Sequence, residues 1–379
     1  MRDLADVVLR LLHVVGGIAW IGASLYFIKL DLKLEPPKRK ADAEAGVNGE
    51  YWGIHGGGFY HSQKYAVAPP ELPEHLHWFK WQAYTTWLSG FALLVVLYWL
   101  DAGTRLVDPA VADLAGWQAV ALSAGGLLLA GMLYDGACSV LRDDRAVAAF
   151  VAVLVVASAF AAGQLFAARA SFLQVGAMLG TIMAGNVLLT IMPAQRELVR
   201  AKREGREPDP AHGARAKQRS VHNNYLTLPV VFTMLAGHFP LAYGHGRAWL
   251  VLVAIFALLV AVRHFFNLWH RGVRAWWIPA VVAAGAVALA VVLAPEDPPM
   301  RTGLLGEAVV QQIVEERCQA CHVGAAAPAG VVLETLDDVR TNAAAIQAQL
   351  RANAMPPGNA TGMTDAERAD LVAWAAAAR

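Results

Sequence analysis

Charged residues are scarce in this sequence: Asp, Glu, Lys and Arg make up 16% of it, whereas hydrophobic residues make up 57%. Soluble domains contain about a quarter charged residues, so the composition indicates a membrane protein that contacts the lipid bilayer. The net charge is only +1. Without an excess of basic residues, we expect no nucleic-acid partner.

Cysteine is also rare, with three residues in a chain of 379. Two of them belong to one short motif, and the third, Cys138, stands alone in an apolar segment. This count excludes a disulfide framework. Cys138 is interpreted as a small residue that packs between helices.

Long apolar runs, by contrast, are abundant. A bilayer core of about 30 Å requires about 20 apolar residues in each helix that crosses it. The first run is interpreted as a membrane helix and not as a cleavable signal, because Asp3 and Asp6 interrupt its basic character. Eight windows qualify, at about 7–29, 79–100, 117–139, 146–166, 171–192, 224–241, 247–268 and 275–294.

Basic residues are distributed unevenly among the connections between these windows. They gather in 31–78 and 193–222, with further pairs after the third and seventh windows, while each alternate connection holds a single arginine. Cytoplasmic loops are enriched in Lys and Arg, so this pattern predicts that both termini lie outside the cytoplasm. In a bacterial inner membrane, both termini would then be periplasmic.

The motif Cys318-Gln319-Ala320-Cys321-His322 has the C-x-x-C-H spacing of a c-type haem attachment site. Two cysteines one helical turn apart form the thioether bonds, and the adjoining histidine lies beneath the iron. The alternative, half of a thioredoxin-like or zinc site, lacks a βαβ context and a second cysteine pair. Haem c is attached outside the bacterial cytoplasm, which agrees with the side predicted from the loop charges.

The sixth iron ligand is expected to be a methionine in the loop before the last helix. Met355 is followed by two prolines that fix the loop, whereas the competing Met363 lies at the start of that helix. We therefore favour Met355. Ligation by His322 and Met355 raises the haem potential relative to two histidines, so this domain is expected to accept electrons and pass them to a soluble cytochrome c or a terminal oxidase.

Two helices are predicted around the haem motif. Residues 306–317 are amphipathic, with Val309, Val310, Ile313 and Val314 on one face, and Thr364 and Glu367 form a capping box that opens the last helix. A proline-rich stretch at 295–299 is interpreted as a stiff linker. The predicted fold is therefore all-α: an eight-helix transmembrane bundle (1–298) followed by a small class I-like cytochrome c domain (299–379).

The connection after the first window contains an unusual run, residues 51–65, in which three consecutive glycines stand among aromatic residues and histidines. Glycine permits close approach of the backbone to a flat ligand. An interfacial aromatic belt with a turn is the alternative. Such a belt accounts for Trp and Tyr but not for His55, His61 and Lys64, which favours a binding role.

Several motifs resemble the membrane-bound urate hydroxylases. They are W-x-x-H-G-G-G-F-Y, K-Y-x-V-A-P, L-H-W-F-K-W-x-A-Y-x-T-W-L-S-G-F, H-N-N-Y-L-T-L-P-V and R-H-F-F-N. The resemblance covers essentially the whole chain and implies an eight-helix urate oxidase domain joined to a cytochrome c. The sequence departs from it at Gly237-His238-Phe239-Pro240, where the family pattern has Asn-His-Tyr-Pro and the histidine is kept.

The resemblance implies oxidation of urate to 5-hydroxyisourate, in purine catabolism, without hydrogen peroxide. That reaction needs a base, a cradle for the anion and an electron sink. Lys64, His61 and Tyr65 are the candidates for the first two tasks, with His55 and the glycine amides as supporting donors. These catalytic roles are hypotheses.

Histidines in or near the apolar windows raise the question of a second cofactor. His13 and His238 lie toward the outer side, and His77 and His264 toward the cytoplasmic side. Ionisable residues within membrane helices are costly and are often functional. Histidines grouped at two depths in the membrane could each bind a haem b as a pair of axial ligands, with His13 and His238 as the outer pair. The alternative is a set of hydrogen-bonded interfacial histidines.

Two other functions are compatible with a cytochrome tail on a membrane domain. One is an electron-transfer subunit that oxidises quinol or receives electrons from a partner dehydrogenase, without a substrate site of its own. The other is a transporter with an attached redox sensor, which predicts an inverted repeat with broken helices. The His and Lys residues of the 51–65 run favour an enzyme, and no clear inverted repeat is seen.

Overall fold

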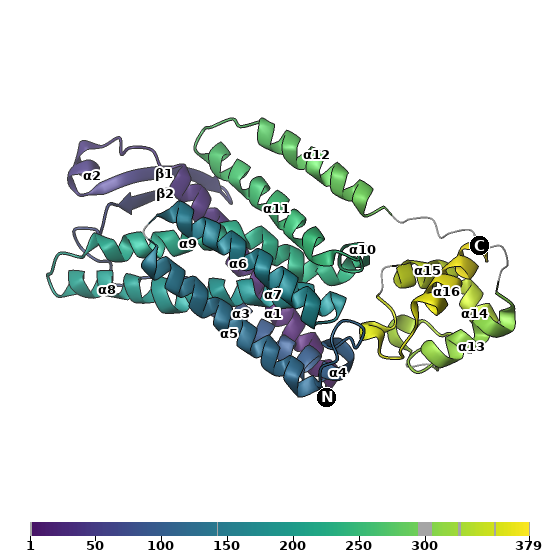
Figure 1. Ribbon diagram of the computed structural model, residues 1–379. Coiled ribbons are helices and arrows are strands. Elements are labelled where there is room, and N and C mark those ends of the chain that lie inside the picture. Colours follow the sequence, from purple (N-terminus) through teal and green to yellow (C-terminus); the bar gives the residue numbers. More distant parts are fainter. Residues whose placement is uncertain (1, 142, 295–304, 325–326, 352–353, 379) are drawn as a thin grey trace.

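The computed structural model describes residues 2–141, 143–294, 305–324, 327–351 and 354–378. Long helices form one bundle, a β-hairpin stands at one end of it, and a smaller helical domain stands at the other end (Figure 1). The N-terminus lies at the same end as the small domain. The linker predicted at 295–299, and the domain boundary within it, lie outside the described residues.

Each predicted apolar window contains a helix. The elements are α1 (Arg2–Leu32), α3 (Trp81–Leu94) with its extension η1 (Val95–Trp99), α5 (Gly116–Val140), α6 (Asp144–Leu165), α7 (Ala168–Gly185) with its extensions η2 (Asn186–Ile191) and α8 (Met192–Arg203), α9 (Pro210–Leu235), α11 (Ala248–His270) and α12 (Trp277–Val292). Short elements fill the connections: α2 (Lys40–Glu44), α4 (Ala102–Arg105), η3 (Ala236–His238) and α10 (Pro240–Tyr243).

Five helices in the described part of the chain are long and apolar enough to cross a bilayer: Leu4–Leu32, Gly116–Val140, Asp144–Leu165, Ala168–Arg203 and Ala248–His270. The apolar helix α12 is shorter, at 16 residues. The structure therefore supports a membrane protein, while a count of eight spans stays a prediction.

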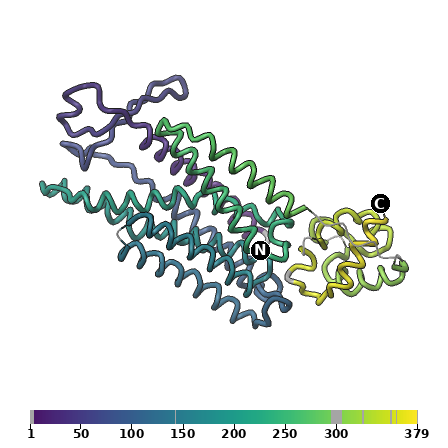
Figure 2. The backbone as a smooth tube through the Cα atoms, turned by 45° about the horizontal axis from the view of Figure 1, so that its top comes forward, coloured from purple at the N-terminus to yellow at the C-terminus, as the bar shows by residue number. Residues whose placement is uncertain are grey.

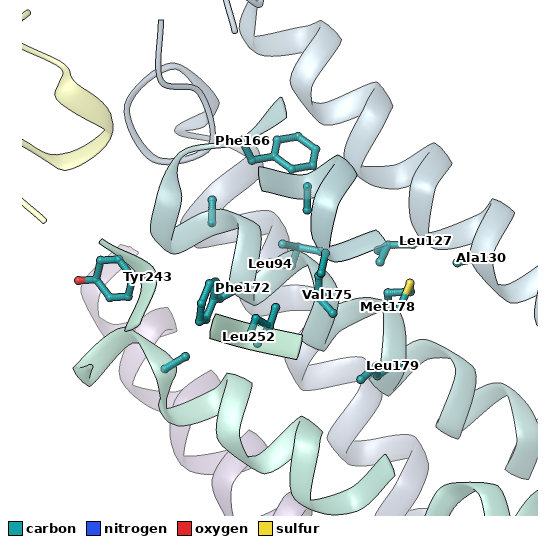
Figure 3. Packing of buried hydrophobic residues seen from close by; sticks show 14 of the residues in the cluster. Leu94, Leu127, Ala130, Phe166, Phe172, Val175, Met178, Leu179, Tyr243 and Leu252 are labelled. Atoms are coloured by element: carbon teal, nitrogen blue, oxygen red, sulfur yellow. The ribbon is translucent and has the colours of Figure 1, made fainter. Parts of the chain in front are cut away.

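Helix α7 lies at the centre of the bundle. Eleven of its 18 residues are buried, and Phe172, Val175, Met178 and Leu179 pack into the main apolar core (Figure 3). Gly176 allows α9 to approach closely, because a Cβ there would lie 2.1 Å from Thr233 Oγ1. Small residues of this kind allow close helix packing in lipid, where apolar burial gives little driving force between helices.

A β-hairpin makes the all-α prediction wrong at residues 47–65. Strands β1 (Val47–His55) and β2 (Gly58–Tyr65) pair antiparallel, with His55 opposite Gly58. Gly56 and Gly57 have φ values of 57° and 81°. A two-residue turn between twisted strands requires positive φ at both positions, and glycine adopts it at little cost. These two glycines therefore form a turn, which is a simpler role than approach to a ligand.

The small domain consists of helices α13 (Glu307–Arg317), α14 (Leu336–Thr341), α15 (Ala343–Arg351) and α16 (Asp365–Ala377), with the short turns η4 (Pro328–Gly330) and η5 (Pro357–Asn359). Helix α13 confirms the amphipathic helix predicted at 306–317, although Val309 is exposed and the other three apolar residues of that face are buried. The capping box of Thr364 and Glu367 is also confirmed.

The small domain contacts the bundle through its loop before α16. Turn η5 lies against α4, and Ala354 packs against the main core of the bundle. Both views show this loop beside the bundle, at the end opposite the hairpin (Figures 1 and 2). The residues around Met355 therefore form the link between the two domains.

Candidate functional site

The predicted haem attachment motif, Cys318 to His322, begins where α13 ends. Cys318 caps that helix, and the backbone N–H of His322 donates to the Cys318 carbonyl at 3.0 Å, so that the motif forms one further turn. Cys318 is half-buried against the domain core and Cys321 is exposed. Burial raises the pKa of the Cys318 thiol to about 11.

The His322 ring is held by the backbone. Its Nδ1 donates to the carbonyl oxygen of Val331 at 2.8 Å. This hydrogen bond places the proton on Nδ1 and leaves the lone pair of Nε2 for a metal, which is the usual arrangement of a ligating histidine. The donor set of two thiols and one oriented imidazole therefore fits haem c.

The two methionines near α16 occupy different environments. Met363 is 3% exposed and belongs to the core that contains Leu371 and Trp374. Met355 is half-buried and lies outside that core, and its carbonyl accepts a hydrogen bond from Arg368 Nη1 at 2.6 Å. Met363 has a packing role that accounts for its position, so Met355 stays the predicted sixth ligand.

The hairpin places His61 in a polar pair that was not predicted from the sequence. Its Nε2 lies 2.9 Å from Oε2 of Glu50, and its ring stacks on Trp52 at 4.1 Å between centroids. The backbone N–H of Lys38 and the His61 ring both hydrogen-bond to Glu50, and they lower the pKa of its carboxyl. Glu50 lies on strand β1 and His61 on strand β2, so their hydrogen bond can be predicted only once the pairing register of the two strands is known.

Lys64 lies on the opposite face of β2 from His61, because residues three apart in a strand point to opposite sides. Its ammonium forms an ion pair with Asp31 at the end of α1, and the same carboxylate lies 3.6 Å from Lys217 of α9. His55 is at the turn, whereas Tyr65 is at the far end of β2. The structure thus does not bring the four predicted residues together on one face, and their catalytic roles stay predictions.

The histidines considered for haem b have other contacts. Nδ1 of His13 donates to the Thr86 carbonyl at 2.9 Å, and its ring fills the space left by Gly90, where a Cβ would lie 2.7 Å from Cε1. Nδ1 of His264 lies 2.8 Å from the Tyr225 hydroxyl. His238 and His77 are both exposed. These contacts fit interfacial histidines, and no observation on the described residues fits a haem b, so no step is assigned to one.

Two family models match parts of the chain. Residues 1–294 match the model described as urate oxidase N-terminal. The chain belongs to that family. Residues 306–374 match the model described as cytochrome C oxidase, cbb3-type, subunit III, which supports a cytochrome c domain there. No curated protein and no solved structure matches the chain.

The urate oxidase N-terminal region also contains a buried polar network that sequence reasoning missed. Arg219 is 5% exposed, and it donates to Asp135 at 2.7 Å and to Asn186 at 3.3 Å. Asn186 donates in turn to Asn223 and to the Tyr134 hydroxyl, both at 2.9 Å. The network starts where α7 widens into the π-helix η2, a feature often found at functional sites. Repeated Asn and Arg within otherwise apolar helices were its only sequence signal.

Proposed function

We propose that this protein oxidises urate to 5-hydroxyisourate at a bacterial inner membrane, in purine catabolism, and delivers the electrons to its own haem c. The observation that carries the proposal is the fusion itself. A urate oxidase N-terminal region of residues 1–294 is joined to a domain in which Cys318, Cys321 and His322 are arranged to hold haem c. An electron acceptor built into the same chain removes the need for oxygen as the direct oxidant.

The proposed reaction balances without hydrogen peroxide. Urate and one water give 5-hydroxyisourate, two protons and two electrons. A new C–O bond forms at carbon 5 of the purine, where the water keeps one proton as the new hydroxyl group and loses the other, and the second proton leaves from a ring N–H of urate. Cys318, Cys321, His322 and Met355 would hold haem c, which would supply a one-electron acceptor, so each urate would require two transfers to a soluble cytochrome c or a terminal oxidase.

Residues of the hairpin supply a proton acceptor in this proposal. The ionised Glu50 carboxylate holds the His61 imidazole in one orientation, as an orienting carboxylate does for a general base. Lys64 is held by Asp31 and contributes positive charge near the same end of the bundle. Basic loops also occupy that end, which supports a cytoplasmic position for the hairpin and a periplasmic position for the cytochrome.

The contact between the domains supports electron delivery within one chain. The loop that carries Met355 packs on the bundle through Ala354, and η5 lies against α4. A cytochrome that served only a separate partner would need this loop to be exposed. Its packing on the bundle favours an enzyme over an electron-transfer subunit fed by another protein.

Anaerobic addition of urate to the purified haem-loaded protein tests the proposal. We expect urate to reduce haem c, with two equivalents of reduced haem formed for each urate consumed. Reduction by a quinol but not by urate would overturn the proposal in favour of an electron-transfer subunit.

A pair of lysine variants tests the role of the hairpin. Lys64→Ala is expected to lower urate turnover by about 100-fold, the usual effect of removing one charge-stabilising donor from an active site. Lys217→Ala is the matched control, since Lys217 pairs with the same Asp31 carboxylate and is 66% exposed. Full turnover in Lys64→Ala would remove Lys64 from the site.

A further inference from the structure

Arg263 of α11 is a buried cation without a counter-ion. It is 6% exposed, and its Nε donates to the Oδ1 of Asn224 on α9. Within the described ranges, no carboxylate lies at ion-pair distance from its guanidinium. A buried charge is costly unless a partner of opposite charge compensates for it, and the cost is greater within a bilayer.

Three unpartnered polar atoms lie on the same side of α11. Arg263 Nη2, Asn267 Oδ1 and His270 Nδ1 are all buried without a hydrogen-bond partner. Residues 263, 267 and 270 are spaced four and three apart, so their side chains share one face of the helix. Buried polar groups in native proteins are nearly always satisfied. An unfilled cluster of donor and acceptor atoms therefore points to a ligand.

Arg219 shows what a structural arginine looks like in this bundle. It is equally buried, at 5% exposure, but its guanidinium is paired with Asp135 and with Asn186. The charge of Arg219, which stabilises the bundle, is thus compensated by the carboxylate of Asp135. Arg263 has no such carboxylate, and its spare donor Nη2 remains available for an anion.

The cluster lies at the end of the bundle nearest the hairpin. Helix α11 runs from the cytochrome end to its last turn beside the hairpin (Figure 1). Lys29 and Lys33, at the end of α1, lie close enough to act electrostatically on His270. Positive charge from two helices therefore converges on the last turns of α11, and it favours an anionic ligand.

We propose that Arg263 and Asn267 bind the urate anion, with Asn224 as a positioning residue; this inference deepens the proposed function and rests on it. Urate is a planar anion that carries carbonyl oxygens beside ring N–H groups. Arg263 Nη2 donates to an oxygen or to a deprotonated nitrogen, while Asn267 Oδ1 accepts from a ring N–H. Asn224 fixes the guanidinium through its Nε, so that Nη2 is held in place before the ligand arrives.

Binding of urate to protein whose haem c has first been reduced separates recognition from turnover. Arg263→Gln should weaken equilibrium binding of urate by roughly 30-fold or more, because a buried charged partner is lost. Arg263→Lys keeps the charge but lacks the forked donor, and should bind with intermediate affinity. Arg274→Gln is the control: Arg274 is an exposed arginine after the same helix, stacked on Trp269 at 3.7 Å, and its loss should leave binding unchanged.

Thermal unfolding supplies a second readout. Without urate, Arg263→Gln should melt at or above the wild-type temperature, because an unpaired buried charge is removed. A saturating concentration of urate should raise the melting temperature of the wild type but not that of Arg263→Gln. An arginine needed only for the fold would instead lower the melting temperature of the ligand-free variant.

The outcomes distinguish the inference from the function on which it rests. Equal binding of urate by the wild type and Arg263→Gln, with haem content unchanged, would overturn the assignment of Arg263 alone. A wild type that neither binds urate nor is reduced by it would overturn the proposed function together with this inference.

Discussion

Replacement of Met355 by leucine separates iron ligation from packing. Leucine nearly conserves the volume of methionine, and such exchanges usually cost less than about 1.5 kcal/mol. Met355 is half-buried and lies outside the core of the cytochrome domain, so the domain should remain folded. Loss of the sulfur ligand should lower the haem potential by a measurable part of the roughly 0.8 V that axial ligands span.

Met363 provides the comparison. It is 3% exposed within the core, so Met363→Ala should cost about 2–5 kcal/mol through the lost contacts and the cavity. Met363→Leu should cost less than about 1.5 kcal/mol, as a swap of similar volume. Neither change removes the predicted ligand, so both variants should keep the wild-type haem potential wherever they are folded.

Redox titration of the full-length protein, with the charge-transfer band of methionine-ligated ferric haem as a second signal, measures both effects. Met355→Leu should lose the band and lower the potential, while Met363→Leu keeps both. The opposite pattern, with the band retained in Met355→Leu and lost in Met363→Leu, would refute the assignment. A urate-reducible haem in Met363→Leu would further show that the domain contact is intact.

Two more predictions concern stability, one for the bundle and one for the cytochrome domain. Gly90→Ala should destabilise the bundle by about 1–3 kcal/mol, because the new methyl group collides with the His13 ring, and a lower melting temperature in detergent measures it. In the cytochrome domain, burial opposes ionisation of Glu367, but hydrogen bonds from Arg317 and the Thr364 cap outweigh it and lower its pKa. The stabilisation from ionised Glu367 is fully present above about pH 4.3, and it is lost as the pH falls through the pKa of Glu367 in the folded protein. Glu367→Gln should therefore be about 1 kcal/mol less stable than the wild type at neutral pH, and the difference should vanish in acid. Melting curves monitored by haem absorbance measure this difference. Glu316→Gln is the control: it removes an exposed carboxylate 3.6 Å from the same Arg317 and should show no such pH trend.

Local patterns accounted for most of the helices. Windows of apolar residues, the capping box at Thr364 and the C-x-x-C-H spacing are properties of short segments, and each has the expected helix or turn. The error lay in the 51–65 run, where an all-α fold was predicted and the structure has a β-hairpin. A two-residue glycine turn between short aromatic runs is a hairpin signal.

The candidate site was less accessible to sequence reasoning, because its partners are distant in the chain. Asp31 forms an ion pair with Lys64, 33 residues away in the sequence, and Glu50 contacts His61 only because of the strand register. Nothing in the sequence marks Arg219 as structural and Arg263 as unpaired, since both are arginines within apolar helices. The difference between them is the presence or absence of a carboxylate on a neighbouring helix.

The sequence by itself determined the membrane character and the family, and it predicted the haem attachment residues. These depend on composition and on contiguous motifs, whose chemistry is set by residues one or two turns apart. Only the tertiary structure decided which charges are neutralised, that Met363 is a core residue, and that the Met355 loop packs on the bundle. Charge pairing and burial depend on contacts between helices that are far apart in the sequence. No local pattern indicates which of these helices will be in contact.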